Sequence, residues 1–192
     1  MNRAMSTRRV RLVVFCSAML LGGIATTTES GHVVTGRSDS SVNLFRERVA
    51  AYTELRLQII DDLLENGIDP NAQDGREFRQ RLGLAIRDAR RHSQPGEIFC
   101  AGVDGRLREM VWNALRGEDD ILSEVPEVSN VRVNDFYPEG EPLATVPPLL
   151  LQKFEPLPAE LQYRFLSNAL ILLDIDAALI VDFIPNAFQR TS

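Results

Sequence analysis

The chain has 192 residues, with 27 acidic and 21 basic side chains, a net charge of −6, two Cys and two His. The 44% hydrophobic and 25% charged fractions are those of a globular protein and argue against wholesale disorder. The acidic balance argues against a general nucleic-acid binder, because proteins neutralise phosphate backbones with clustered Lys and Arg.

The N-terminal stretch 1–25 predicts an export signal. It holds four Arg and no acidic residue, and its segment Leu12–Ala25 carries no charge at all. This apolar run is shorter than the about 20 residues that a membrane-spanning helix needs, and it suits a secretory signal cleaved after Ala25. Cys16 lies in the middle of the run, where lipid attachment does not occur. We therefore expect a periplasmic or secreted protein that contacts the membrane only if the signal remains uncleaved.

The exported form differs from the full chain in charge and in cysteine content. Cleavage removes Cys16 and four Arg, which leaves a net charge of −10 and Cys100 as the one cysteine. A single Cys cannot form an intramolecular disulfide, and the apolar neighbours of Cys100 predict a buried small side chain. Residues 26–42 are rich in Ser, Thr and Gly and predict a flexible leader.

Apolar residues at three- and four-residue steps predict helices over 43–66, over 74–91, and from residue 102 or 104 to 116. Together, residues 43–124 are expected to form a three-helix bundle. Asp74 is the expected N-cap of the second helix, and Trp112 the expected packing anchor of the third. The buried stripe of the first helix is predicted to comprise Phe45, Val49, Tyr52, Leu55, Ile59 and Leu63, with Arg56 outside it.

The C-terminal part of the chain predicts a connector followed by a sheet. Residues 125–160 are Pro-rich, with a strand candidate at 131–133 and a short helix at 149–154. Alternating and apolar runs then predict strands over 161–167, 170–175 and 179–184, with a turn at Asn168-Ala169. The predicted fold class is therefore α+β: one domain over 43–188, whose helices cover a three-stranded antiparallel β-meander at 161–184.

Three aspartates near the C-terminus are the first candidates for chemistry. Asp174, Asp176 and Asp182 could form a metal or acid/base site. We favour a simpler interpretation, in which Asp176 caps a turn and Asp182 occupies an exposed strand position. The segment 69–75 resembles a calcium loop but lacks the required Gly and Glu. His92 and Cys100 are not placed together by any pattern, so the sequence predicts no catalytic, cofactor-binding or metal-ligating residue.

The basic face of the second predicted helix is a candidate for partner contact, because Arg recognises carboxylates and phosphates. Pairing with Asp61, Asp62 and Glu65 of the preceding helix is the alternative. The arginines of this face are Arg76, Arg79, Arg87, Arg90 and Arg91.

Several short motifs resemble those of a family of uncharacterised bacterial exported proteins over residues 43–188. The likeness implies export and one integrated domain, and it implies no activity or site. The meander, with Tyr163-Arg164-Phe165 and Ile180-Val181-Asp182, is also similar to the C-terminal region of periplasmic nickel/cobalt homeostasis proteins. The family motifs lie at 48–56, 86–90, 131–134, 137–140, 142–148, 157–158, 161–165 and 179–185.

These observations predict a non-catalytic exported protein that binds a partner or serves a structural role in the cell envelope. The partner is unknown and could be another envelope protein. Two alternatives remain: an envelope hydrolase of unfamiliar type that uses carboxylates such as Asp174 and Asp182, and an assembly or regulatory protein that acts through the Arg-rich helix.

Overall fold

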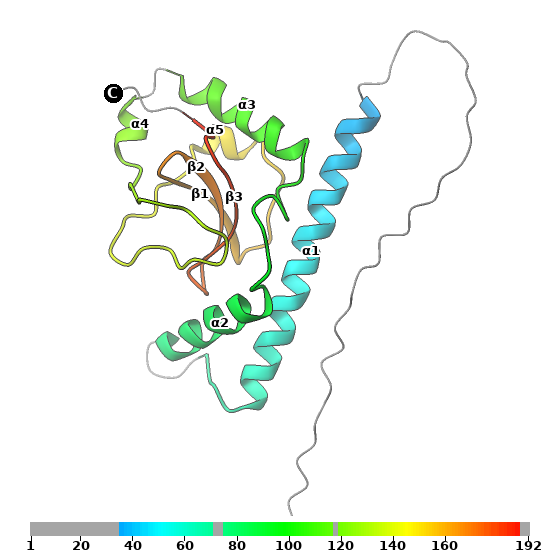
Figure 1. Ribbon diagram of the computed structural model, residues 1–192, viewed down its shortest axis with the longest axis vertical. Helices are drawn as coiled ribbons and strands as arrows, with labels where there is room; N and C mark the ends of the chain where they lie inside the picture. Colours follow the sequence, from blue (N-terminus) through cyan, green and yellow to red (C-terminus); the bar gives the residue numbers. More distant parts are fainter. Residues whose placement is uncertain (1–34, 71–74, 117–118, 189–192) are drawn as a thin grey trace, which may run out of the picture. The chain divides into compact units, whose positions relative to one another are not determined.

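The computed structural model describes residues 35–70, 75–116 and 119–188 (Figure 1). Helices and a three-stranded antiparallel sheet with strand order β1-β2-β3 confirm the α+β class. The predicted signal segment 1–25 lies outside the described residues. In chain order the elements are α1 (Thr35–Glu65), α2 (Arg76–Ala89), α3 (Val103–Leu115), α4 (Asp119–Ser123), α5 (Pro148–Leu151), β1 (Leu161–Leu166), β2 (Ala169–Asp174) and β3 (Leu179–Ile184).

The helix α1 begins earlier than the sequence pattern predicts. It starts at Thr35 instead of residue 43, so residues 35–42 of the expected leader belong to a helix. Val42 is buried and joins the same core as Phe45 and Val49, which gives this additional turn an apolar contact. The predicted stripe is otherwise largely confirmed, because Tyr52 and Ile59 are also buried.

The helix α2 has the expected amphipathic pattern, with Phe78, Leu82 and Ile86 buried. Its cap is Gly75, whose φ of +61° suits glycine better than other residues. Asp74, the predicted cap, lies outside the described residues. In α3, Val103, Leu107 and Val111 are buried as expected.

Trp112 does not anchor α3 in the core. Its side chain is 37% exposed, and it is absent from the clusters of buried residues within the described part of the chain. The prediction of a packing anchor is therefore wrong: Leu107, Val111 and Leu115 fill the inner face of α3.

The meander forms with small shifts in its turns. Leu166 pairs with Ala169, so Ser167 and Asn168 make the turn, one residue earlier than expected. Ser167 adopts a φ of +54°, which is typical of two-residue hairpin loops. The third strand has the predicted bounds. Between β2 and β3 the pairing passes from Leu172–Asp182 to Leu173–Ile180, so Val181 is an extra residue and forms a β-bulge.

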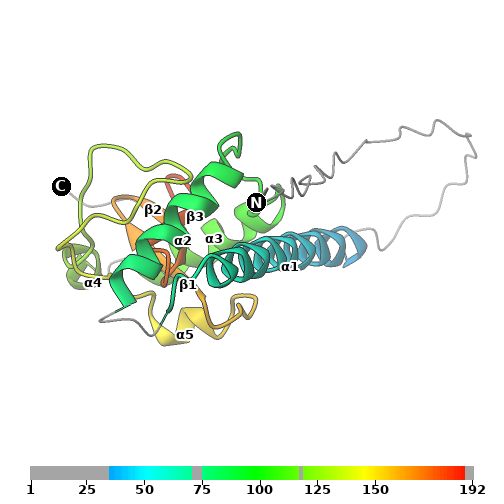
Figure 2. The same ribbon diagram turned by 90° about the horizontal axis from the view of Figure 1, so that it is seen from below.

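Both faces of the sheet are covered, and the whole of β2 is buried. One face, with Leu172 and Leu179, joins the main core that α1, α2 and α3 supply. Figures 1 and 2 show these three helices gathered around the sheet. The other face, with Ile171 and Ile180, is covered by the segment 128–137. This segment is irregular at 131–133, so the predicted strand there is wrong; Val131 packs on the sheet from a loop.

No helix within residues 35–70, 75–116 and 119–188 combines the length and the apolarity required to cross a lipid bilayer.

Gly83 lies where α2 packs closely on Phe136 and on the turn between β2 and β3, and a substitution there tests this packing. A Cβ at this position would lie 2.5 Å from Phe136 Cε1 and 2.7 Å from the backbone oxygen of Ala177. We expect Gly83→Ala to lower the free energy of unfolding by about 1–3 kcal/mol through overpacking, although Ala favours helices. Urea denaturation measures this change.

Gly105 in α3 is the matched control, because a Cβ there would meet no atom within 4 Å. Gly105→Ala should leave stability unchanged or raise it by up to about 1 kcal/mol. Equal effects of the two substitutions would contradict the close packing of α2 on Phe136 and Ala177.

Candidate functional site

Asp174, at the end of β2, is fully buried and accepts four hydrogen bonds. One carboxylate oxygen, Oδ2, accepts from the Tyr52 hydroxyl at 2.7 Å and from Arg56 Nε at 2.9 Å. The other, Oδ1, accepts from the backbone N–H groups of Asp176 at 3.1 Å and Ala177 at 2.9 Å. Asp174 therefore caps the turn that the sequence assigned to Asp176, and it also fastens α1 to the sheet.

Arg56 is buried, in contrast to its predicted place off the apolar stripe. It lies one helical turn after Tyr52, so both side chains reach the same carboxylate. Its guanidinium also pairs with Asp176, whose side chain is 52% exposed. Burial, followed by the charge of Asp174, raises the pKa of Tyr52 well above its ordinary value. The phenol thus remains a hydrogen-bond donor to Asp174.

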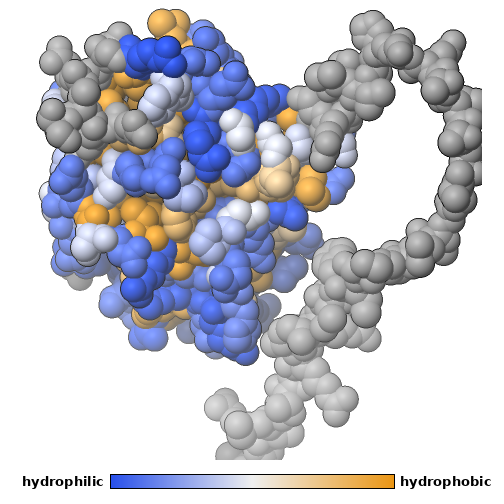
Figure 3. Space-filling view, turned by 45° about the horizontal axis from the view of Figure 1, so that its top comes forward, coloured by the Kyte–Doolittle hydropathy of each residue, from blue (hydrophilic) through white to orange (hydrophobic). Residues whose placement is uncertain are grey.

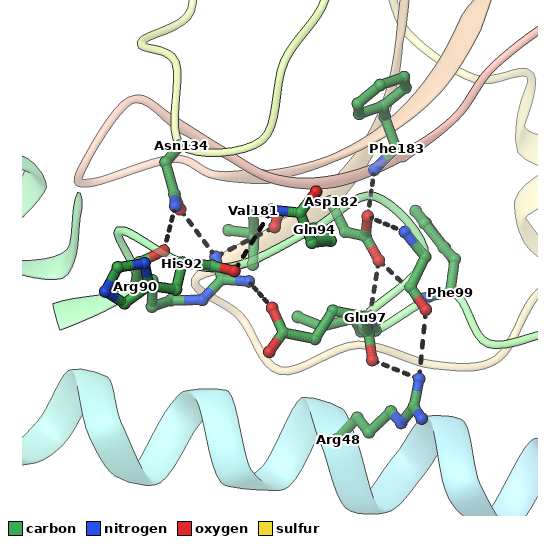
Figure 4. Close-up of polar contacts among 12 residues, drawn as sticks. Arg48, Arg90, His92, Gln94, Glu97, Phe99, Asn134, Val181, Asp182 and Phe183 are labelled. Atoms are coloured by element: carbon green, nitrogen blue, oxygen red, sulfur yellow. Dashed lines mark hydrogen bonds and ion pairs between the residues drawn. The ribbon is translucent and has the colours of Figure 1, made fainter. Parts of the chain in front are cut away.

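Asp182, on β3, is also fully buried, so the prediction of an exposed strand position is wrong. Its Oδ1 accepts from the N–H of Gly96 at 2.8 Å, and its Oδ2 accepts from Ile98 at 2.7 Å and Phe99 at 2.8 Å (Figure 4). The bulge supplies the physical reason for this orientation. Asp182 pairs with Leu172, whose side chain lies in the helix-covered core, and so it points toward the same side.

Arg90 is the third buried charge that the sequence placed on the surface, after Arg56 and Asp182. Its Nη1 donates to the carbonyl of Val181, the bulge residue, at 3.0 Å and to Asn134 Oδ1 at 3.2 Å (Figure 4). Asn134 in turn donates to the Arg90 carbonyl at 2.6 Å. The guanidinium lies 5.3 Å from the ring centroid of Tyr52. Arg90 therefore connects α2, β3 and the segment before Phe136, and it does not belong to a basic surface.

The remaining arginines of the predicted basic face lie on the surface of α2 or just past its end. Arg87 lies over the ring of Phe136, 5.9 Å from its centroid. Arg91, two residues past the end of α2, is 3.9 Å from Asp88. Arg76 and Arg79 are exposed, and each of them interacts with another group of the protein. The structure thus leaves four of the five predicted contact residues accessible.

The other candidates for chemistry do not form a shared site. Cys100 is buried, as predicted, with its Sγ 3.4 Å from the Ser41 carbonyl. His92 is exposed and accepts a hydrogen bond from Arg91 Nε at 3.2 Å. Part of the calcium-like segment, 71–74, lies outside the described residues. Within the described ranges, no group of three or more His, Cys, Asp or Glu side chains could hold a metal ion.

Two hollows on the surface offer room for a ligand. The first, of about 440 Å³, lies beside β1 and is lined by Leu151, Glu155, Pro156, Leu157, Leu161, Gln162, Tyr163 and Arg164. The second, of about 490 Å³, is lined by Ile121, Ser123, Glu124, Val125, Pro142, Leu143, Ala144 and Thr145. Neither Asp174 nor Asp182 lines these hollows. The sequence patterns gave no sign of them, because the first depends on how 151–157 folds back beside β1 and the second brings 121–125 together with 142–145.

No family model, curated protein or solved structure matches this chain. Functional inference therefore rests on the residues and contacts described above.

The Asp174 cluster gives a prediction about stability. Asp174→Ala would leave the buried Arg56 guanidinium with only the half-exposed Asp176 as its carboxylate partner. Breaking a buried ion pair in this way costs about 3–5 kcal/mol, and we expect that loss in the free energy of unfolding measured with urea. Asp176→Asn is the control and should cost less than about 1 kcal/mol, because its carboxylate is solvated. A small loss in Asp174→Ala would contradict the anchoring role of this contact.

The environment of Asp182 gives a prediction about pH. Burial raises the pKa of this carboxyl, although four backbone N–H groups, those of Phe99, Gly96, Ile98 and Phe183, oppose the shift. Because the folded protein then binds the proton more readily than the unfolded chain, the contribution of Asp182 to stability decreases as pH rises through its folded pKa. Below the unfolded pKa this contribution is fully present.

Unfolding of the wild type and Asp182→Asn should be compared from about pH 4 to pH 7. The stability of the wild type relative to the variant should fall as the pH rises across this window. The opposite slope would show that the backbone donors outweigh burial and lower the pKa.

Proposed function

We propose that this chain is an exported, non-catalytic binding protein of the cell envelope. One observation carries the proposal: both fully buried carboxylates use their oxygens to hold the fold together. Asp174 accepts from α1 and from its own turn, and Asp182 accepts from the backbone of 96–99. Neither lines either of the two surface hollows described above. This arrangement favours binding over hydrolysis by Asp174 and Asp182.

Export remains a part of the proposal that rests on the sequence alone. The basic residues before the uncharged run Leu12–Ala25 and the small residues at Gly23 and Ala25 support a cleaved signal. The resemblance to uncharacterised bacterial exported proteins points the same way. The mature protein would then act in the periplasm or outside the cell.

The helical part is proposed to act as a three-helix bundle that supports the sheet. In favour of this, α1 contacts both α2 and α3, and all three contribute to one apolar core. Residues 43–188 would then form one integrated domain, so that binding at the surface is supported by a rigid interior.

The surface provides the area on which a partner would bind. Figure 3 shows apolar residues on one face of the molecule, interrupted by polar ones. Exposed apolar side chains rimmed by polar ones would form part of the contact with such a partner. Contact through Arg76, Arg79, Arg87 and Arg91, on α2 and just past its end, is a further part of this proposal, with Arg90 excluded because it is buried.

A capture experiment tests the proposal. The chain lacking residues 1–25, immobilised and incubated with envelope extract, should retain a defined partner in a fixed ratio. Fractionation of cells that produce the full chain should recover a product shortened by the signal. A purified chain that turns over a substrate, with kcat lost in a folded Asp174→Asn or Asp182→Asn variant, would instead support the hydrolase alternative.

A further inference from the structure

The outer edge of β1 is only partly covered by the rest of the chain. With strand order β1-β2-β3, one side of β1 has no neighbouring strand. Near its end this side meets the segment 144–145, through the bridge Thr145–Arg164 and a hydrogen bond from the Phe165 N–H to the Ala144 carbonyl at 3.3 Å. Strand residues alternate, so the N–H of Tyr163 points toward the same side as that of Phe165. On the same side, the Leu161 N–H donates to the Pro158 carbonyl at 3.0 Å, so the open stretch of the edge is the one around Tyr163. Open strand edges can pair with another extended chain.

The first hollow occupies the place beside the uncovered half of this edge. Its lining is mixed, with the apolar side chains of Leu151, Pro156, Leu157 and Leu161 beside four polar or charged ones. Its volume of about 440 Å³ is sufficient for several side chains. An extended segment placed here would lie against the β1 backbone on one side and against 151–157 on the other.

The groove is lined by one acidic side chain, Glu155, and one basic side chain, Arg164, and their ion pairing differs. Glu155 is neutralised by two arginines, Arg46 at 2.7 Å and Arg106 at 3.2 Å. Arg164 donates to the carbonyl of Tyr163 at 3.2 Å and to the side chain of Gln162. No carboxylate among the described residues forms an ion pair with Arg164, and its buried Nε has no hydrogen-bond partner there. Partial burial of Arg164 lowers the pKa of its guanidinium.

We propose that the groove beside β1 binds an extended peptide segment that pairs with the strand edge and places a carboxylate side chain on Arg164. The inference rests on the proposed binding function and specifies its site and ligand. Backbone pairing would supply affinity, and the carboxylate would supply specificity, as in other cases of β-strand addition. The terminal Nη atoms of Arg164 would donate to this carboxylate, and charge-assisted hydrogen bonds are about twice as strong as neutral ones.

The second hollow is a weaker candidate for the same role. Its charged lining residue is Glu124, and no strand of the sheet lines it. The geometry therefore assigns the peptide to the groove beside β1.

The test uses fluorescent peptides of about six residues, the usual length of a strand. One alternates Val and Glu, the second alternates Val and Lys, and the third is the Val/Glu peptide with methylated backbone nitrogens. Anisotropy titrations should show binding of the Val/Glu peptide alone. Equal binding of the Val/Lys peptide, equal binding of the methylated peptide, or no binding of the Val/Glu peptide up to about 1 mM would overturn the proposal.

Two variants of the full chain locate the binding site. Arg164→Gln should raise the Kd of the Val/Glu peptide about tenfold, the effect of losing one charge-assisted contact. Arg81→Gln, on the exposed surface of α2 and outside the proposed contact residues, is the matched control and should leave the Kd unchanged, with circular dichroism to confirm folding. Loss of binding in Arg81→Gln but not in Arg164→Gln would place the peptide on α2 and overturn the assignment.

Capture from envelope extract separates this inference from the proposed function. If Arg164→Gln and the wild type retain the same partner equally well, the chain is a binding protein whose partner uses another surface. If neither retains any partner, the proposed function itself fails.

Discussion

The packing of α1 on the sheet depends on the carboxylate of Asp174. A buried carboxylate is costly unless its lone pairs are occupied, and Asp174 receives two side-chain and two backbone donors. Tyr52 and Arg56 provide the side-chain donors, and their positions one turn apart set the rotation of α1 about its axis. The apolar residues of α1 would tolerate a small rotation, whereas this contact would not.

The same requirement organises the loop between α2 and α3. Asp182 holds the backbone of 96–99 against β3, and Arg90 satisfies the carbonyl of Val181 beside it. The bulge makes both contacts possible, because it turns Val181 and Asp182 toward the helices. Buried charges in this protein therefore join segments that the apolar core alone would position less specifically.

This use of the charged residues bears directly on function. The oxygens of Asp174 and Asp182 accept hydrogen bonds from the fold itself, and neither residue lines either of the two surface hollows described above. The groups that remain available are on the exterior: the partly open edge of β1, the groove beside it, and Arg164 without a carboxylate. The partly open edge of β1 and the groove beside it fit the proposed binding of an extended chain.

The sequence by itself determined the α+β class, the strand order of the meander and most helix positions, because the apolar periods of 3.6 and 2 are local properties of the chain. Local patterns treat Asp and Arg as surface residues, and for that reason Arg56, Arg90 and Asp182 were assigned to the exterior. Only the tertiary structure decided their burial, since each is compensated by a partner distant in the sequence. Val181 shows the same limit: an extra residue inside the apolar strand β3 cannot be recognised until the register with β2 is known. The groove beside β1 likewise exists only once 151–157 and the strand lie together.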